Sequence, residues 1–257
     1  MTEFVPWLLD WAYPAAVIAL GYVVLGLTGF GSALVAVPLL AWRWPLVEVV
    51  PMVLLIEVLA SLLMGGLNLR EVRWDEARRL LPGMVVGALL GLWLAQRATS
   101  AAPLIVLGAY VMWVGAQAFR AWPAAAGDQV PASPAWLGAL YGGGVGLVEM
   151  LFGTAGPLVL AWLAQRRVDA RGMRASTPAI IMVAALGAIA LMAVDGRLAS
   201  GAIWQRLLVL LPVAVASVLA GHALAHRMPT EALRRGICGL LILSGAMLIL
   251  NALRRMG

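Results

Sequence analysis

Long apolar runs alternate with short polar connectors along the whole chain. Several runs reach about 20 residues without a charge, the length at which a helix crosses a hydrocarbon core of about 30 Å. The runs cover roughly residues 14–42, 45–66, 80–96, 102–119, 135–163, 176–195, 205–225 and 236–253. They are continuous rather than alternating, and a segment in lipid must satisfy its own backbone, so the pattern predicts an all-α, polytopic membrane protein.

The chain reads as two related halves. Identical residues recur 130 positions apart: Trp74 and Trp204, Pro82 and Pro212, Gly91 and Gly221, Arg97 and Arg227, and Gly115 and Gly245. Several matches at one offset indicate internal duplication, which is frequent in transporters. We therefore predict a first repeat at 1–122, a connector at 123–134 and a second repeat at 135–257, each with a first segment followed by three plain transmembrane helices.

The first segment of each repeat is interrupted. The breaks consist of small and polar residues around a phenylalanine: Thr28, Gly29, Phe30, Gly31 and Ser32 in the first repeat, and Phe152, Gly153, Thr154, Ala155 and Gly156 in the second. The pieces beside the first break have roughly a dozen residues, or about 18 Å of helix, which is half of a membrane. Each segment is therefore either one tilted, broken span or a re-entrant hairpin.

Arginine positions discriminate between these two interpretations. If both segments spanned the membrane, nine arginines would lie on each side, and Arg73 and Arg166 would be on opposite sides. If both are hairpins, twelve arginines, Arg73 and Arg166 among them, share one side. The other six, which include Arg43 and Arg206, take the opposite side. Twelve against six obeys the positive-inside bias. We therefore favour hairpins, inverted repeats and a multi-pass protein of the inner (plasma) membrane with both termini in the periplasm.

The two breaks are the first candidates for a substrate site. A broken membrane helix exposes backbone N–H groups where its second piece begins, and these donors and the helix dipole favour an anion. Thr28, Ser32 and Thr154 could add hydroxyl groups. The alternative is that the glycines only allow close helix packing. Because the breaks recur in both repeats, we expect them to face each other at a shared site.

A second candidate is the start of the span that follows residue 175. Arg174 could hold an oxyanion there, beside the hydroxyl groups of Ser176 and Thr177. The alternative is an ordinary cytoplasmic arginine followed by an ordinary helix cap.

Two acidic residues lie inside apolar runs. A carboxylate in hydrocarbon is costly, so Glu57 and Glu149 should face the protein interior or be protonated. Such groups suit proton coupling, and the alternative is a neutral glutamic acid hydrogen-bonded between helices. His222 is a weaker candidate for a proton relay, because a packing role also explains it.

Composition excludes several classes of protein. All 18 basic residues are arginines in short loops, the pattern of a topology signal, so nucleic acid is not an expected partner despite a pI of about 10.6. The single Cys238 rules out a disulfide or a cysteine-based metal site. No hydrolase, nucleotide-loop or zinc-ligand motif is present, so we expect neither an enzyme nor a metal or other cofactor. The expected partners are a small anion and the bilayer, and a homodimer stays open.

Three stretches resemble the TauE/SafE family of sulfite exporters and anion permeases: GLTGFGSALVAVPLLAW (26–42), NLREVRWDEARRLLPGMVVGALLG (68–91) and LFGTAGPLVLAWLAQRRVDARGMRAST (151–177). The resemblance covers nearly the whole chain. It implies transport of sulfite or organosulfonates, with Gly29, Phe30, Gly31, Gly153, Gly156 and Arg174 at or near the pathway. The chain departs from the family at Glu57 and Glu149, where many relatives carry an amide or apolar residue. A secondary transporter working by alternating access, with proton coupling as a further hypothesis, is the leading prediction. An anion channel and a carboxylate permease are the alternatives.

Overall fold

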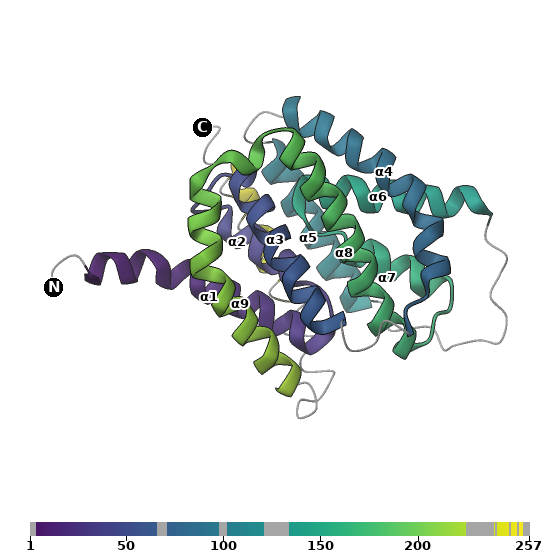
Figure 1. Cartoon of the computed structure of the whole chain (residues 1–257), viewed down its shortest axis with the longest axis horizontal. Coiled ribbons are helices and arrows are strands. Elements are labelled where there is room, and N and C mark those ends of the chain that lie inside the picture. Colours follow the sequence, from purple (N-terminus) through teal and green to yellow (C-terminus); the bar gives the residue numbers. More distant parts are fainter. Residues whose placement is uncertain are drawn as a thin grey trace.

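The computed structural model describes residues 4–65, 71–97, 102–120 and 134–224, together with most of 239–253, and the connector predicted at 123–134 lies almost entirely outside these residues. The described part is helical throughout (Figure 1). Its elements are α1 (Phe4–Thr28), α2 (Ser32–Leu40), α3 (Leu46–Gly65), α4 (Trp74–Arg97), α5 (Ala102–Arg120), α6 (Ala135–Phe152), α7 (Gly156–Gln165), α8 (Ala170–Val194), the 3-10 turn η2 (Arg197–Ala199) and α9 (Gly201–Leu224). The all-α prediction is confirmed.

Among the described residues, five helices are long and apolar enough to cross a membrane: Asp10–Thr28 of α1, Leu46–Leu63 of α3, Trp74–Arg97 of α4, Ala175–Val194 of α8 and Gly201–Leu224 of α9. The predicted length of the first piece is wrong. Helix α1 begins at Phe4 and has 25 residues instead of about a dozen. The helix continues through Pro14, although an internal proline removes one backbone donor and crowds the preceding turn.

The first broken segment folds back on itself. The Tyr13 hydroxyl of α1 donates a hydrogen bond to the Leu39 carbonyl of α2 at 2.8 Å. Closer to the break, a Cβ added to Gly21 would lie 2.9 Å from the carbonyl oxygen of Ser32. Helix α2 therefore runs antiparallel beside α1.

The second broken segment has the same shape. The Tyr141 ring of α6 lies 5.4 Å from the Trp162 ring of α7, and nearer the break Gly144 approaches the Leu158 side chain. The chain thus reverses direction at both breaks, as the hairpin interpretation predicts and a tilted span does not.

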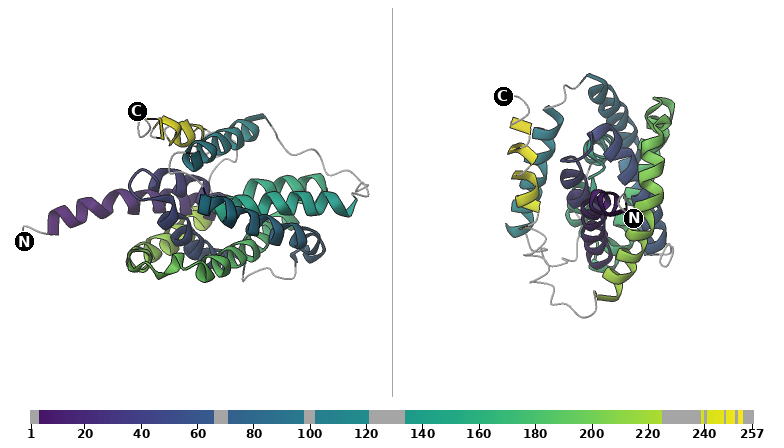
Figure 2. Two further views of the ribbon diagram at one scale, coloured as in Figure 1. Left: turned by 90° about the horizontal axis from the view of Figure 1, so that it is seen from above. Right: turned by 90° about the vertical axis from the view of Figure 1, so that its left-hand side faces the viewer.

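Each hairpin packs against a long helix of the other half. A Cβ added to Gly87 of α4 would lie 2.0 Å from the Gly143 carbonyl oxygen of α6, and one added to Gly26 of α1 would lie 2.3 Å from the Val218 carbonyl oxygen of α9. Small residues allow such close backbone contact between membrane helices. Figure 1 shows these two helix pairs on either side of α3 and α8, and Figure 2 shows α5 beside the C-terminal helical residues on one face.

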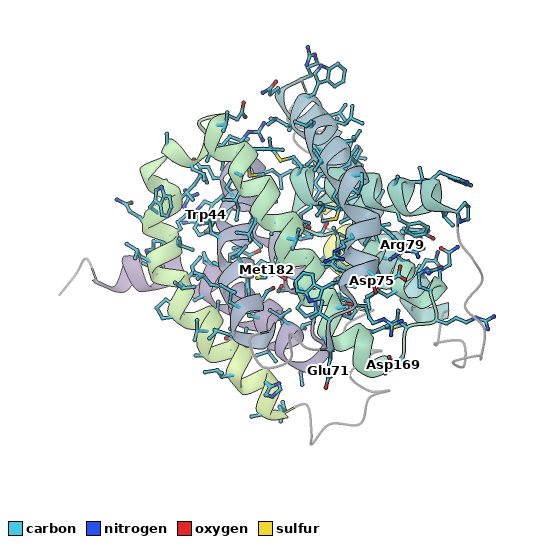
Figure 3. All side chains as sticks on the ribbon, turned by 45° about the vertical axis from the view of Figure 1, so that its right-hand side comes forward. Trp44, Glu71, Asp75, Arg79, Asp169 and Met182 are labelled. Carbon is cyan, nitrogen blue, oxygen red and sulfur yellow. The ribbon has the colours of Figure 1, made fainter. Side chains whose placement is uncertain are left out.

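Charged side chains gather at two ends of the bundle. At one end Arg206 forms an ion pair with Glu48 at 2.5 Å. The Arg206 guanidinium also lies 4.2 Å from the ring centroid of Trp44, the residue that follows Arg43 in the sequence. At the other, Arg166 pairs with Glu76 at 3.0 Å. We call these the Arg43 end and the Arg166 end; Figure 3 shows Trp44 toward the first and Glu71 and Asp169 toward the second.

The hairpin interpretation predicts this grouping of arginines. Arg43 lies with Arg206, and the backbone N–H of Arg73 bonds to Ser176 Oγ, at the Arg166 end. If both broken segments spanned the membrane, Arg43 and Arg206 would lie on opposite sides, and so would Arg73 and Arg166.

Candidate functional site

Both breaks end their first helix in the same way. After α1, the N–H of Gly29 donates to the Leu25 carbonyl at 2.7 Å, and Gly29 has φ 84°. After α6, the N–H of Gly153 donates to the Glu149 carbonyl at 2.8 Å, with φ 65°. Glycine adopts this left-handed conformation without the steric cost that other residues incur, which explains a glycine at both positions.

Each second piece begins at an N-cap residue whose own side chain does not cap the helix. Gly31 is the N-cap of α2 and Ala155 that of α7, and at the start of α7 the Glu149 carboxyl group accepts the N–H of Ala155. The first N–H groups of a helix have no partner within it and carry the positive end of its dipole. Both helix starts therefore favour a negatively charged group, and at α7 Glu149 already supplies one acceptor oxygen.

The two breaks meet between α3 and α8. A Cβ added to Gly156 would lie 3.5 Å from Phe30 Cδ2 of the first break and 3.4 Å from Ile181 Cδ1 of α8. A Cβ added to Gly153 would lie 3.2 Å from Leu54 Cδ2 of α3. Phe30 and Gly156, which are 126 positions apart, thus lie in contact, and the second break is buried.

Glu57 joins the first break to α3. Its side chain is buried, and its Oε2 accepts a hydrogen bond from Ser32 Oγ at the start of α2. The buried Tyr22 hydroxyl of α1 also interacts with this carboxyl group and donates to the Val53 carbonyl at 3.3 Å. Glu57 therefore holds the two arms of the first hairpin to the central helix.

Glu149 occupies the second break. Its Oε2 accepts a hydrogen bond from the N–H of Ala155 at 3.0 Å, and the carboxyl group lies close enough to Glu57 for the two to interact electrostatically. Its Oε1 has no hydrogen-bond partner among the described residues, and neither has the buried hydroxyl of Thr154. Buried polar atoms are nearly always paired, so unpaired ones mark a place for a ligand, an ion or water.

The other predicted residues differ in where their polar atoms point. The Thr28 hydroxyl donates to the carbonyls of Val24 and Phe30 and so serves the turn itself. Ser176 Oγ accepts the N–H of Arg73, whereas the buried Thr177 hydroxyl has no partner within the described part of the chain.

Two of the predicted residues are not placed at the breaks. The side chain of Arg174 lies outside the described residues. His222 is exposed near the end of α9.

The sequence analysis missed two tyrosines and an arginine. Tyr22 contacts Glu57, and the Tyr110 hydroxyl of α5 donates to the Thr154 carbonyl at 3.0 Å. A tyrosine inside an apolar run is the signal that could have found both, since a buried hydroxyl needs a partner. Arg197, in the turn after α8, was not among the predicted site residues, although it lines a pocket.

Paired breaks that meet inside a bundle of membrane-length helices are typical of membrane transporters. The chain belongs to the sulfite exporter TauE/SafE family, whose sequence profile matches residues 14–248. It is 42% identical over 194 residues to the probable inner membrane transporter protein TsaS of Comamonas testosteroni. The aligned region covers 76% of this chain and 80% of that protein. No solved structure matches the chain.

Proposed function

We propose that the protein is a secondary transporter that moves a small sulfur-containing anion, of the sulfite or organosulfonate class, across the inner membrane by alternating access. The observation that carries this proposal is the meeting of two helix starts, one uncapped and one where Glu149 accepts the N–H of Ala155, beside buried oxygen atoms without partners. An anion there would exchange its water for amide donors. The family and the inner-membrane relative support the class of substrate and the location.

The packing supports an arrangement as inverted repeats. Helix α1 packs on α9 and α6 packs on α4, so each hairpin meets the equivalent long helix of the other half. Three crossings per repeat would invert the second half relative to the first. With the Arg166 end in the cytoplasm, the positive-inside bias places both termini in the periplasm.

Alternating access requires that the central site open to one side at a time. The Arg166 end is closed by a buried ion pair between Glu76 and Arg166, to which Trp162 Nε1 adds a hydrogen bond at 3.1 Å. At the Arg43 end a pocket lies beside the more exposed pair of Arg206 and Glu48. The structure therefore fits the state that is open toward the periplasm.

Coupling to protons would use the two buried glutamates. Glu57 and Glu149 touch opposite breaks and interact with each other, so the charge of one depends on that of the other and on a bound anion. A proton and an anion bound together at this depth leave less net charge in the membrane than the anion alone.

Transport into proteoliposomes tests the proposal. We expect saturable uptake of sulfite or a sulfonate that accelerates when unlabelled anion is preloaded, because an alternating carrier exchanges substrate. An anion channel would give unsaturable flux without this acceleration. Preference for simple carboxylates over sulfonates would favour the carboxylate permease instead.

A further inference from the structure

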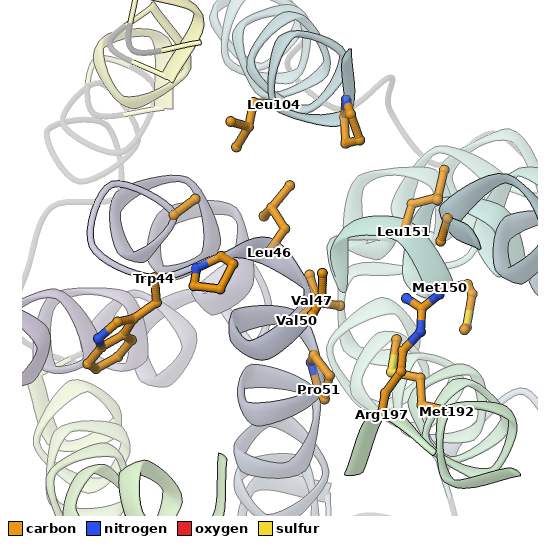
Figure 4. A pocket seen from close by; sticks show the side chains of 14 residues that line it. Trp44, Leu46, Val47, Val50, Pro51, Leu104, Met150, Leu151, Met192 and Arg197 are labelled. Carbon is orange, nitrogen blue, oxygen red and sulfur yellow. The ribbon is translucent and has the colours of Figure 1, made fainter. Parts of the chain in front are cut away.

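A pocket of about 160 Å³ opens at the Arg43 end, between the start of α3 and the ends of α4 and α8 (Figure 4). Its walls are mainly apolar and include Trp44, Val47, Leu104 and Met150. Arg197 is the charged residue that lines it, and Figure 4 shows its side chain directed toward Met150. The pocket thus combines one cation with a hydrocarbon lining.

Arg197 is held in place from behind. Gly196, with φ 79°, turns the chain after α8, and Nε of Arg197 then donates to Asp195 Oδ2 at 2.6 Å. Gln96 of α4 donates to the other oxygen of Asp195 at 2.7 Å. The Arg197 hydrogen bond lowers the pKa of Asp195, so the pair stays ionised at neutral pH. Within the described residues the terminal nitrogens of Arg197 have no partner, which leaves them as donors for a ligand.

The pocket borders on the second break. Val50 lines the pocket and also contacts the position of a Cβ on Gly153, while Met150, another lining residue, follows Glu149 in α6. A ligand in the pocket would therefore lie one layer of side chains away from the central region.

We propose that Arg197 captures the headgroup of an organic anion at the Arg43 end, while the apolar body of that anion rests against Val47, Leu104 and Met150. One guanidinium among apolar walls cannot replace the hydration of a bare inorganic oxyanion, but it can pair with a headgroup while the walls bury a hydrocarbon chain. The inference rests on the proposed transport function and narrows its substrates to anions with an apolar substituent.

The test is binding of an alkanesulfonate series to the purified full chain in detergent, from methanesulfonate to hexanesulfonate, with sulfite as the bare anion. We expect the affinity to rise by up to about fourfold for each buried methylene. Arg197→Gln should weaken every member by about 10- to 100-fold, and Arg197→Lys should restore part of this loss. Val47→Asn, at an exposed position, should flatten the dependence on chain length without unfolding the protein.

Arg43→Gln is the matched control, because Arg43 lies at the same end but pairs with Asp10 outside the pocket. Equal affinity of wild type and Arg197→Gln, or equal affinity for sulfite and butanesulfonate, would overturn the inference. Binding of phosphatidylglycerol with no binding of soluble sulfonates would also overturn it, since the pocket would then hold a lipid headgroup.

Transport separates this inference from the proposed function. If the wild type shows counterflow and Arg197→Gln leaves its rate unchanged at low substrate concentration, the capture site is wrong and the proposed transport function stands. If binding depends on Arg197 but no transport is seen, the capture site stands and the proposed transport function is wrong.

Discussion

At the scale of single residues, the two buried glutamates can be tested without disturbing their hydrogen bonds. Glu57→Gln keeps an oxygen that accepts from Ser32, and Glu149→Gln keeps one that accepts from the N–H of Ala155. Both variants remove the titrating proton. We expect each to fold within about 1 kcal/mol of wild type and to lose uptake driven by a pH gradient in proteoliposomes.

Uptake driven by the anion gradient alone is the control for these variants, and it should persist. If both variants respond to a pH gradient as wild type does, the glutamates do not couple transport to protons.

The glycines of the breaks offer a second test. Gly29 and Gly153 share a left-handed conformation, in which any L side chain is strained by about 1–2 kcal/mol. A Cβ at Gly29 meets nothing within 4 Å, whereas one at Gly153 meets Leu54. We expect Gly153→Ala to reduce thermal stability and transport more than Gly29→Ala, as measured by thermal unfolding and uptake. Equal effects would mean that the second break does not rest against α3.

The sequence predicted the breaks better than their partners. Gly29 and Gly153 are recognisable because glycine clusters interrupt apolar runs at matching places. The contact of Tyr22 with Glu57, or of Tyr110 with Thr154, depends on how distant helices pack, and no local pattern encodes it. For the same reason the sequence did not indicate that Arg197 lines a pocket.

At the scale of helices, the α4–α6 contact depends on the absence of side chains. Gly87 faces the backbone of Gly143 so closely that a methyl group would lie 2.0 Å from its carbonyl oxygen. We expect Gly87→Ala to cost at least the 1–3 kcal/mol that is typical of overpacking, and to lower the melting temperature of the purified protein.

Gly187 of α8 is the matched control for this helix contact, because a Cβ there meets nothing within 4 Å. Gly187→Ala should leave stability unchanged or raise it by up to about 1 kcal/mol, since alanine is the better helix former. A stable Gly87→Ala protein would show that α4 and α6 pack less closely than described.

Helix positions followed from the apolar runs, but helix partners did not. The runs located α3, α4, α8 and α9 closely, because a span in lipid needs an uninterrupted apolar length. Glycines on both helices, such as Gly83 and Gly142, allow α6 to pack closely on α4. The sequence does not reveal this contact, because the fit of the two helix surfaces depends on how they are brought together.

At the scale of the whole molecule, each end carries an ion pair, and the members of these pairs on α4 and α9 lie at equivalent positions but have opposite charge. Glu76 of α4 pairs with Arg166, and Arg206 of α9, 130 positions after Glu76, pairs with Glu48. The side chains of the first pair are 9% and 8% exposed, and those of the second 17% and 24%. We infer that breaking the buried pair favours opening at the Arg166 end.

Glu76→Gln tests this inference in a protein that carries Cys238→Ser to remove the native thiol. Thr177→Cys in α8 supplies the reporter thiol, because the Thr177 side chain is buried. Loss of one partner of a buried ion pair costs about 3–5 kcal/mol, and every 1.4 kcal/mol that favours the open state raises its population relative to the closed state tenfold. We expect a membrane-impermeant thiol reagent at the Arg166 end to label the reporter at least tenfold faster than in the parent protein. Asp10→Asn, which breaks an exposed pair, should leave the rate unchanged.

The side from which labelling occurs distinguishes a carrier from a channel. In a carrier, opening at the Arg166 end closes the Arg43 end, so Glu76→Gln should slow labelling of a Val50→Cys reporter in the pocket while it accelerates labelling of Thr177→Cys. In a channel the two ends need not be linked, and the Val50→Cys rate would stay constant or rise. Opposite changes at the two ends are therefore the result that requires alternating access, because only a conformational equilibrium shared by both ends produces them.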